Sequence, residues 1–550
     1  MNPIDRLKNS FQLWSTWLFR KERFSRLLGL PRCTGSGDQP GLILIQIDGL
    51  SYTQFQRALN RDRLPFIRQL LEKNGYVEKP FYSGLPSSTP AVQGELFYGI
   101  KTVVPAFEFI DNSTRLRHAM FLPASANAIA RQLQQTGQPL LAGGSSYSNI
   151  YSGGAATARY CAETMNLESL IRAVNPIKLA LFVVIQAGKL FRILGVACLE
   201  LILGVYDFIK GMVSGKNIVK ELKFIPTRLF VCIILRELIR LRVKMDATRG
   251  VPIIAANFFG YDEQAHRRGP GSAFAHWTLK GIDGVARDIY RTAMRSQCRD
   301  YRVVIYADHG QESVHSYHRH AGKPLKQAIR EVIAEKQGPE DSRDERDADD
   351  ILANLYRRAG NVLFGQSGPM RGHRKFFTAG SADRVRITTM GPLGHVYLPH
   401  STRIQLDPVD PSPALEQLAR RLNRQAHIPL VLFQKKGSIA AVNDSGVFTL
   451  SKDRETILGN DHPFLDQTAE DLSRLCLHPN AGDLVVSGWK PGGAPISFNI
   501  ESGAHGGPGK EETRGFVLLP PCMKNDASWM RPLDLRDQIF AYIEKGQRVP

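Results

Sequence analysis

Six residues whose side chains bind metal ions stand near the ends of short apolar runs in this 550-residue chain. Three are aspartates and three are histidines: Asp48, Asp262, His266, Asp308, His309 and His505. Short apolar runs are typical of buried strands, and open α/β sheets hold their ligands beyond the carboxyl ends of the strands. Because carboxylates and imidazoles both bind divalent ions, these six residues suffice for two such ions.

A hydroxyl group stands at a predicted helix start in the same part of the chain. Thr89 follows Ser87-Ser88 and precedes Pro90, an order typical of a capped helix with proline in its first turn. The backbone N–H groups and the dipole at such a start favour negative charge, so an anion fits beside the hydroxyl. Each motif alone is common in capped turns and on surfaces, and their joint order is what carries the prediction.

The motifs together resemble the alkaline phosphatase superfamily and, within it, the type I phosphodiesterase/nucleotide pyrophosphatase group. Five blocks carry the resemblance: Q-I-D-G (46–49), P-S-S-T-P (86–90), Y-D-E-Q-A-H-R-R-G-P (261–270), A-D-H-G (307–310) and G-A-H-G-G (503–507). The similar part of the chain spans residues 41–320 and 480–520.

This resemblance implies two divalent metal ions, usually zinc, with manganese as the alternative. Asp48, Thr89, Asp308 and His309 would hold one ion, and Asp262, His266 and His505 would hold the other. Thr89 would be the nucleophile, because the first ion would lower the pKa of its hydroxyl while both ions hold phosphoryl oxygens. A phosphothreonine would form, and water activated by the second ion would hydrolyse it.

The chain also departs from the families that it resembles. The nucleotide pyrophosphatases commonly place Asn three residues after the nucleophile, where this chain has Val92, and Gln93 is the candidate substitute. The arginine clamp and serine of alkaline phosphatase cannot be placed, and the C/S-x-P-x-R motif of sulfatases is absent. Ser88 is the alternative nucleophile if the register is displaced by one residue. His315, His318 and His320 could line a pocket, although a solvated loop is the simpler interpretation.

The net charge of +19 comes from 71 Lys and Arg against 52 Asp and Glu, which favours an anionic partner. Residues 1–32 carry seven basic and two acidic residues, and residues 166–249 carry fourteen and six. In both segments the basic residues alternate with large apolar ones, which is typical of amphipathic helices on an anionic membrane surface and not of nucleic-acid binding. Charged residues interrupt the apolar runs, so a spanning helix is less favoured. Helices packed on the protein's own core, or a hairpin that crosses the bilayer, are the alternatives.

Alternating strand and helix patterns predict a mostly parallel sheet flanked by helices. Strands are expected over 41–49, 251–263, 301–310 and 497–507, and helices over 64–75 and 274–296. With the resemblance, the expected fold is α/β: a three-layer, alkaline-phosphatase-like sheet with a helical insertion and a small α+β cap. The expected divisions are a basic amphipathic N-terminal helix (1–40), catalytic core (41–165), helical insertion (166–249), core (250–325), linker and cap (326–480) and core (481–550).

These features predict a metal-dependent phosphodiesterase or phosphohydrolase acting at a membrane surface. Its substrate would be a phosphorylated small molecule or a lipid-linked phosphodiester, with no nucleic-acid partner. We expect it at the cytoplasmic side of the membrane, peripheral or embedded through residues 166–249. No signal peptide is visible, and the seven scattered cysteines suit a reducing compartment. The alternatives are a phosphomonoesterase or phosphonate hydrolase of the same superfamily, or a catalytically inactive membrane-associated scaffold.

Overall fold

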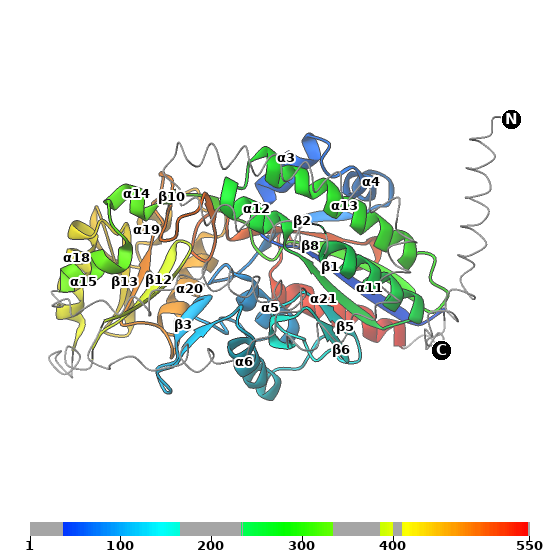
Figure 1. Ribbon diagram of the computed structural model, residues 1–550, viewed down its shortest axis with the longest axis horizontal. Helices are drawn as coiled ribbons and strands as arrows, with labels where there is room; N and C mark the ends of the chain where they lie inside the picture. The colour runs from blue at the N-terminus through cyan, green and yellow to red at the C-terminus, as the bar shows by residue number, and fades with distance from the viewer. Residues whose placement is uncertain (1–36, 165–232, 234, 334–384, 400–409, 548–550) are drawn as a thin grey trace, which may run out of the picture.

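The computed structural model describes residues 37–164, 233, 235–333, 385–399 and 410–547, with a seven-stranded sheet at its centre (Figure 1). The strand order is β2-β19-β8-β1-β7-β5-β6. The bounds are β1 Pro40–Ile47, β2 Val77–Tyr82, β5 Ser145–Tyr147, β6 Thr157–Arg159, β7 Ile253–Phe258, β8 Asp300–Tyr306 and β19 Arg514–Leu519. Only β19 runs against its neighbours; the pairs among β8, β1, β7, β5 and β6 are parallel. The predicted mostly parallel sheet is therefore confirmed.

Helices cover both faces of this sheet, since side chains of the central strand alternate between two cores. Ile43, Ile45 and Ile47 of β1 lie in one core, whereas Leu42 and Leu44 lie in the other. The first core includes residues of α3 (Tyr52–Asn60), α4 (Pro65–Lys73), α11 (Arg236–Arg249), α12 (Gly260–Arg268) and α13 (Ala273–Ala293). The second includes residues of α5 (Thr89–Tyr98), α6 (Pro123–Thr136) and α21 (Pro532–Gln547). Figure 1 shows these helices on the two sides of the sheet, which makes the three predicted layers.

The strand expected over 497–507 is wrong. That stretch holds only two short pairing segments, β17 (Ile496–Ser497) and β18 (Gly503–Ala504), which pair with β10 (His315–Ser316) and β9 (Glu312–Ser313). Its glycines favour a loop, and Gly506 has a φ of 115°. Four strands of the central sheet were not predicted, namely β2, β5, β6 and β19, and the backbone of β19 pairs with β8 and β2. The helices expected over 64–75 and 274–296 are confirmed as α4 and α13.

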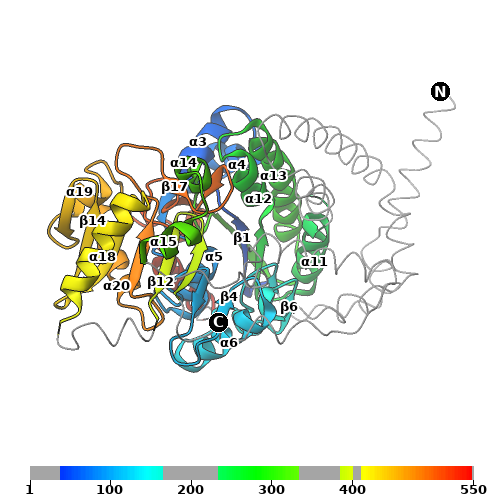
Figure 2. The same ribbon diagram turned by 60° about the vertical axis from the view of Figure 1, so that its left-hand side comes forward.

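The cap is built on a six-stranded sheet of order β11-β12-β16-β13-β14-β15 (Figure 2). The bounds are β11 Arg386–Met390, β12 Leu393–Tyr397, β13 Leu430–Lys435, β14 Ser438–Asn443, β15 Gly446–Thr449 and β16 Leu484–Ser487. Helices α15 (Leu325–Ile333) and α18 (Ser412–Gln425) share one core with this sheet, and α19 (Arg454–Leu458) and α20 (Leu465–Cys476) share another. Because β16 pairs with both β12 and β13, the cap sheet extends beyond residue 480, where its end was expected.

The membrane-associated segments that the sequence predicts lie mostly outside the described residues. This holds for the N-terminal helix and for residues 166–232. Residues 334–384, within the expected linker and cap, also lie outside the described residues. The end of the predicted insertion is described as α11, whose Ile239, Val243 and Ala247 pack in the core beside α13 and β7. For this end of the insertion, the alternative interpretation of a helix packed on the protein's own core is therefore the correct one. Among the described helices, none has the length and apolar character needed to cross a bilayer.

The cysteines differ in part from the expectation of unpaired thiols. Cys161, Cys476 and Cys522 are free, but Cys298 is disulfide-bonded, and its partner lies outside the described residues. Cys298 follows α13 and lies against the end of α11, where its Sγ is 3.3 Å from the carbonyl oxygen of Thr248.

Candidate active site

Three neighbouring strands of the sheet carry five of the six candidate ligands. Asp48 follows β1 directly, and Asp308 and His309 follow β8. Asp262 and His266 lie on α12, which begins two residues after β7 ends. Since β8, β1 and β7 are adjacent and parallel, their carboxyl ends meet at one edge of the sheet. The sixth ligand, His505, comes from the loop after β18.

The first triad consists of Asp48, Asp308 and His309, whose ligand atoms all lie within 4.8 Å of one another. His309 Nε2 is 3.5 Å from Asp48 Oδ1 and 3.4 Å from Asp308 Oδ2. All three side chains are buried. The Thr89 hydroxyl joins this group, with Oγ1 at 3.4 Å from Asp48 Oδ1 and 3.3 Å from His309 Nε2.

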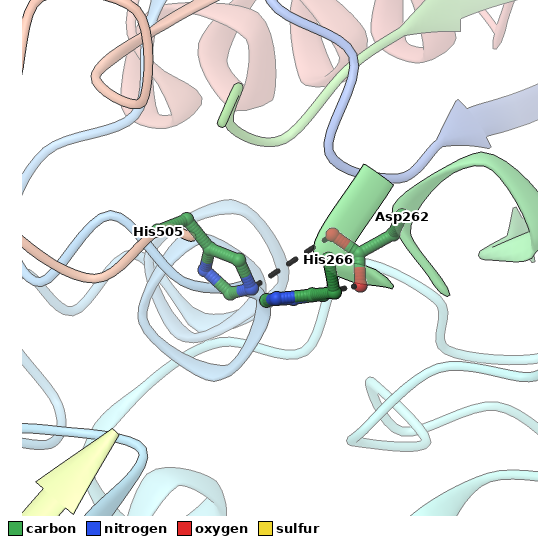
Figure 3. A group of neighbouring side chains, drawn as sticks. All are labelled: Asp262, His266 and His505. Atoms are coloured by element: carbon green, nitrogen blue, oxygen red, sulfur yellow. Dashed lines mark ion pairs between the residues drawn. The ribbon is translucent and has the colours of Figure 1, made fainter. Parts of the chain in front are cut away.

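The second triad consists of Asp262, His266 and His505, which point toward one another in Figure 3. His266 Nε2 lies 3.4 Å from Asp262 Oδ2, and His505 Nε2 lies 3.8 Å from Asp262 Oδ1. The His505 ring also stacks on the His309 ring, with 3.9 Å between centroids. The two triads therefore adjoin and form a single site.

Each of the three histidines is held through its Nδ1 atom. His309 Nδ1 donates to the Gly310 carbonyl at 3.0 Å, His505 Nδ1 to the Ser87 carbonyl at 2.9 Å. His266 Nδ1 donates to Glu501 Oε2 at 2.8 Å. His309 and His505 consequently present the lone pair of Nε2 toward the aspartates. Burial opposes ionisation of His266, but Asp262 and Glu501 outweigh it and raise the pKa of this imidazole well above its ordinary value. Metal-ligating histidines are oriented in this way by acceptors on their far side.

The carboxylates of the first triad lack a compensating positive charge. Burial raises the pKa of Asp48 well above its ordinary value, and the nearby Asp308 and Asp262 raise it further. Burial, with a smaller contribution from Asp262, likewise raises the pKa of Asp308 to about 7. Asp308 Oδ2 is buried and accepts no hydrogen bond from any described residue. A divalent cation fits here, because it would supply both the charge and the missing partner.

Imidazole and carboxylate charges offset one another in the second triad. Burial opposes ionisation of Asp262, but His266 and His505 outweigh it and hold the pKa of this carboxyl below its usual range. Burial and the neighbouring His309 hold the pKa of His505 well below its ordinary value. His505 is thus neutral near pH 7, the state in which an imidazole binds a metal ion.

Helix α5 places the candidate nucleophile. Ser88 is its N-cap, Thr89 its first residue and Pro90 its second, as the sequence predicts. Ser87 Oγ is used by the protein itself, since it donates to the Gly507 carbonyl at 2.9 Å. Ser88 Oγ lies 3.5 Å from the Pro86 carbonyl. Of these three hydroxyls, the one of Thr89 is directed at the first triad.

A buried ion pair fixes α5 relative to the cap. Arg531, just before α21, binds both carboxylate oxygens of Glu95 on α5, at 2.6 and 2.9 Å. The same guanidinium lies 3.4 Å from Asp471 on the cap helix α20. Bidentate arginine–carboxylate pairs fix orientation as well as distance. This contact between distant segments gave no signal in the sequence.

Sequence reasoning also missed two amides that hold Asp48. Asn257 Nδ2 donates to Asp48 Oδ2 at 2.6 Å, and Gln46 Nε2 lies 3.4 Å from the same oxygen. Both amides stand near strand ends, Gln46 on β1 and Asn257 on β7, beside the predicted ligands. That position is the signal by which they could have been found.

The interpretation of Gln93 as a phosphoryl ligand is wrong. Its Nε2 donates to Gln46 Oε1 at 3.1 Å and to Asn149 Oδ1 at 2.9 Å. Its Oε1 accepts from the backbone N–H of Ile150 at 2.7 Å. Gln93 is buried, and its amide is occupied on both sides by the protein, so it supports Gln46 behind Asp48.

The loop that carries His505 is tied to the loop before Thr89 by a buried carboxyl. Glu512 accepts from the backbone N–H of Gly507 at 2.8 Å and of Gly509 at 2.7 Å. Its Oε2 also lies 3.3 Å from Ser87 Oγ. Burial, reinforced by Glu312, raises the pKa of Glu512 to about 8. One side chain therefore fixes the distance between the nucleophile loop and a ligand of the second triad.

Comparisons with known proteins give no close relative. No family model matches the chain, and no curated protein matches it. Among the solved structures similar to this chain is phosphonoacetate hydrolase from Sinorhizobium meliloti 1021 in complex with phosphonoformate. Its sequence is 13% identical, the TM-score is 0.45, and the alignment covers 93% of this chain and 96% of that chain. The similar structures also include murine ectonucleotide pyrophosphatase/phosphodiesterase 5, at 9% identity, TM-score 0.46, covering 92% of this chain and 95% of that chain.

Proposed function

We propose that the chain is a metal-dependent phosphodiesterase that uses Thr89 as nucleophile and binds two divalent ions. The observation that carries this proposal is the pair of adjoining Asp/His triads with a helix-start hydroxyl against the first of them. Three carboxylates, of which those of Asp48 and Asp308 are buried, and three imidazoles with inward Nε2 atoms are arranged around positions that positive charge would stabilise.

Each ion would be held by one triad, with Thr89 added to the first. The mixed imidazole and carboxylate donors favour zinc, with manganese as the alternative. When bound, the ions supply positive charge that lowers the pKa of the nucleophile and stabilises phosphoryl oxygens.

The protein's own residues would position the reacting groups. Thr89 Oγ1 donates its hydrogen toward Asp48 Oδ1, and the start of α5 favours the negative charge that develops as this oxygen attacks phosphorus. The new bond joins Thr89 Oγ1 to phosphorus, and the bond to the leaving-group oxygen breaks. Water then hydrolyses the phosphothreonine and restores the hydroxyl. Thr89 is 7% exposed, so bulk water has little access to it.

The charges of the site favour a diester over a monoester. The only basic side chains that contact the carboxylates of Asp48, Asp262 and Asp308 are histidines, and no described lysine or arginine pairs with them. A monoester carries a second negative charge near pH 7. The described part of the site offers no fixed cationic side chain to neutralise that charge.

The test compares zinc-loaded protein on bis-p-nitrophenyl phosphate and p-nitrophenyl phosphate. We expect kcat/KM for the diester to exceed that for the monoester by about tenfold or more, the effect of roughly 1.4 kcal/mol. A reversed preference would favour the phosphomonoesterase alternative. If neither compound is hydrolysed with zinc or with manganese, the alternative of a catalytically inactive scaffold is favoured.

The nucleophile is tested by Thr89→Ala, with Ser88→Ala as the matched control on the neighbouring hydroxyl. We expect Thr89→Ala to lower kcat by about a thousandfold or more, and Ser88→Ala to change it by less than about threefold. Equal losses in the two variants would contradict the assignment of Thr89.

We also propose that the enzyme acts at an anionic membrane surface on a lipid-linked or membrane-proximal phosphodiester, at the cytoplasmic side. The support comes from the basic, apolar segments 1–32 and 166–232, which lie outside the described residues. Flotation with anionic liposomes should weaken when residues 1–32 are deleted. Binding to duplex DNA but not to liposomes would contradict this proposal.

A further inference from the structure

The two oxygens of the Asp48 carboxylate have different surroundings. Oδ1 lies at the first triad, 3.4 Å from Thr89 Oγ1 and 3.5 Å from His309 Nε2. Oδ2 instead accepts from two side-chain amides, Asn257 Nδ2 at 2.6 Å and Gln46 Nε2 at 3.4 Å. Because a carboxylate oxygen has two lone pairs, these two donors occupy both of those on Oδ2. Asp48 is thus left with one oxygen, Oδ1, for an ion bound in the triad.

The register of the central strands places both amides beside Asp48. Gln46 on β1 lies opposite Asn257 on β7 and opposite Tyr306 on β8. Side chains alternate between the two faces of a sheet, so residues at paired positions share a face and form a row. All three side chains of this row are buried. Burial excludes bulk water as an alternative partner, and the amide N–H groups therefore depend on Asp48 Oδ2.

A backbone donor determines which end of the Gln46 amide faces Asp48. The Ile150 N–H donates to Gln93 Oε1 at 2.7 Å, and because a backbone N–H can only donate, this contact orients the Gln93 amide. Gln93 Nε2 then donates to Gln46 Oε1 at 3.1 Å, and the Tyr306 hydroxyl donates to the same oxygen at 3.0 Å. Gln46 consequently presents its Nε2 to Asp48.

The second amide, that of Asn257, is bonded to Asp48 alone. Its Nδ2 donates to Asp48 Oδ2, and its Oδ1 is buried and accepts no hydrogen bond from any described residue. The distance of 2.6 Å is short, as expected for donation to an ionised carboxylate. Removal of the Asn257 amide therefore acts on Asp48 directly, whereas removal of the Gln46 amide also affects Gln93 and Tyr306.

The carboxylate of Asp308 is divided in a similar way. Its Oδ1 accepts from the Gly49 backbone N–H at 3.4 Å, whereas its Oδ2 accepts no hydrogen bond from any described residue. The first site then offers four ligand atoms, namely Asp48 Oδ1, Asp308 Oδ2, His309 Nε2 and Thr89 Oγ1. Four ligands that include an imidazole are typical of zinc, whereas manganese favours octahedral sites rich in oxygen. An Asp48 free to bind through both oxygens would shift the site toward manganese.

We propose that Asn257 and Gln46 make the first site select zinc over manganese, by holding one oxygen of Asp48 so that only the other is available to an ion. This inference rests on the two-metal site of the proposed function and names the residues that decide between its two candidate metals. Both are positioning residues, because they act through Asp48. Without them Oδ2 becomes a further oxygen ligand, from which manganese gains more than zinc.

The test measures metal binding and does not depend on turnover. Zinc affinity is determined by competition with a chromogenic chelator, and manganese affinity from the electron paramagnetic resonance signal of the free ion. In Asn257→Leu we expect the ratio of the manganese to the zinc dissociation constant to fall by about tenfold for one bound equivalent, an effect typical of groups behind metal ligands. The other equivalent should keep its ratio, because both amides bond Asp48 of the first triad. Gln46→Met should shift the same ratio in the same direction, and it decides the question if Asn257→Leu does not fold.

The matched control is Asn149→Leu. Asn149 is a buried amide of the same network, which accepts from Gln93 Nε2 at 2.9 Å but makes no hydrogen bond to Asp48. Its substitution should lower the free energy of unfolding without changing either ratio.

A purely structural role of the two amides would weaken the binding of both metals equally. Equal losses of zinc and manganese affinity in Asn257→Leu, or in Gln46→Met where Asn257→Leu does not fold, therefore overturn the inference, as does an unchanged ratio. If wild type binds neither metal, the inference and the two-metal proposal fail together. If the ratio falls as expected but no diester is hydrolysed, the proposed phosphodiesterase function fails alone.

Discussion

Removing the charge of Asp308 should stabilise the metal-free protein, although the same change should destroy the first metal site. Burial raises the pKa of Asp308 from 3.8 to about 7, so ionisation of this carboxyl opposes folding when no cation is present. Asp308→Asn keeps the shape of the side chain and retains an oxygen to accept from the Gly49 N–H at 3.4 Å. The new amide N–H₂ would lie beside His309 Nε2, where Asp308 Oδ2 has no donor among the described residues.

The magnitude follows from proton linkage. The folded carboxyl binds its proton more tightly than the unfolded one, so its contribution to the free energy of unfolding falls as pH rises from about 4 to about 7. Each pH unit in this window corresponds to about 1.4 kcal/mol, which gives about 4 kcal/mol in full. Because Asp308 shares its site with two other aspartates, we expect Asp308→Asn to raise the free energy of unfolding of the metal-free protein by about 2–4 kcal/mol at pH 8. Below pH 4 we expect no gain, because the carboxyl of wild type is then protonated in both states.

The assay is urea unfolding of chelator-treated protein at pH 5 and pH 8, followed by fluorescence. Asp262→Asn is the matched control, since His266 and His505 hold the pKa of Asp262 below its usual range and its charge therefore stabilises the fold. We expect Asp308→Asn to raise the stability at pH 8 and Asp262→Asn to lower it. Adding zinc should make wild type more stable to urea than Asp308→Asn, because zinc would bind and stabilise folded wild type more strongly. A loss of stability in metal-free Asp308→Asn at pH 8, or a gain that does not depend on pH, would refute the reasoning.

Further predictions concern the groups around the site. Glu501→Gln should weaken one of two bound zinc equivalents by about 10- to 100-fold in chelator competition. Asp444→Asn should leave both unchanged, because Asp444 contacts Lys490 and Asn423 and no residue of either triad. Gln93→Leu should lower the free energy of unfolding by about 2–4 kcal/mol, because it leaves buried polar partners without hydrogen bonds. A large rise in KM without loss of stability would instead indicate that Gln93 binds substrate. Chelation should abolish diester hydrolysis, and zinc or manganese should restore it; activity that survives dialysis against chelator would exclude the two-metal proposal.

Sequence reasoning located the candidate ligands because one rule covers most of them. Asp48, Asp308 and His309 directly follow strands, and strand ends at one edge of a parallel sheet meet in space. His505 was assigned to a strand that does not exist, yet its glycine-rich surroundings bring it to the same place as a loop. The rule depends on where a segment lies relative to the sheet edge. It therefore placed His505 correctly although the strand expected over 497–507 is a loop.

What the sequence could not show are contacts between side chains of distant segments. Glu501 bonds His266 across 235 positions, and Asn257 bonds Asp48 across 209. Gln93 was misread for a related reason. Every residue of α5 is buried, so no polar face indicates which way a side chain of that helix points.

The position of β19 has a consequence for the order in which the protein matures. In the central sheet β2 pairs only with β19, and β19 also pairs with β8. A chain still attached to the ribosome therefore holds β2 without this neighbour until β19, residues 514–519, has emerged. The first triad needs nothing beyond His309, whereas the second needs His505. During synthesis, the residues of the first triad can thus come together before those of the second, and the complete site must await residue 505.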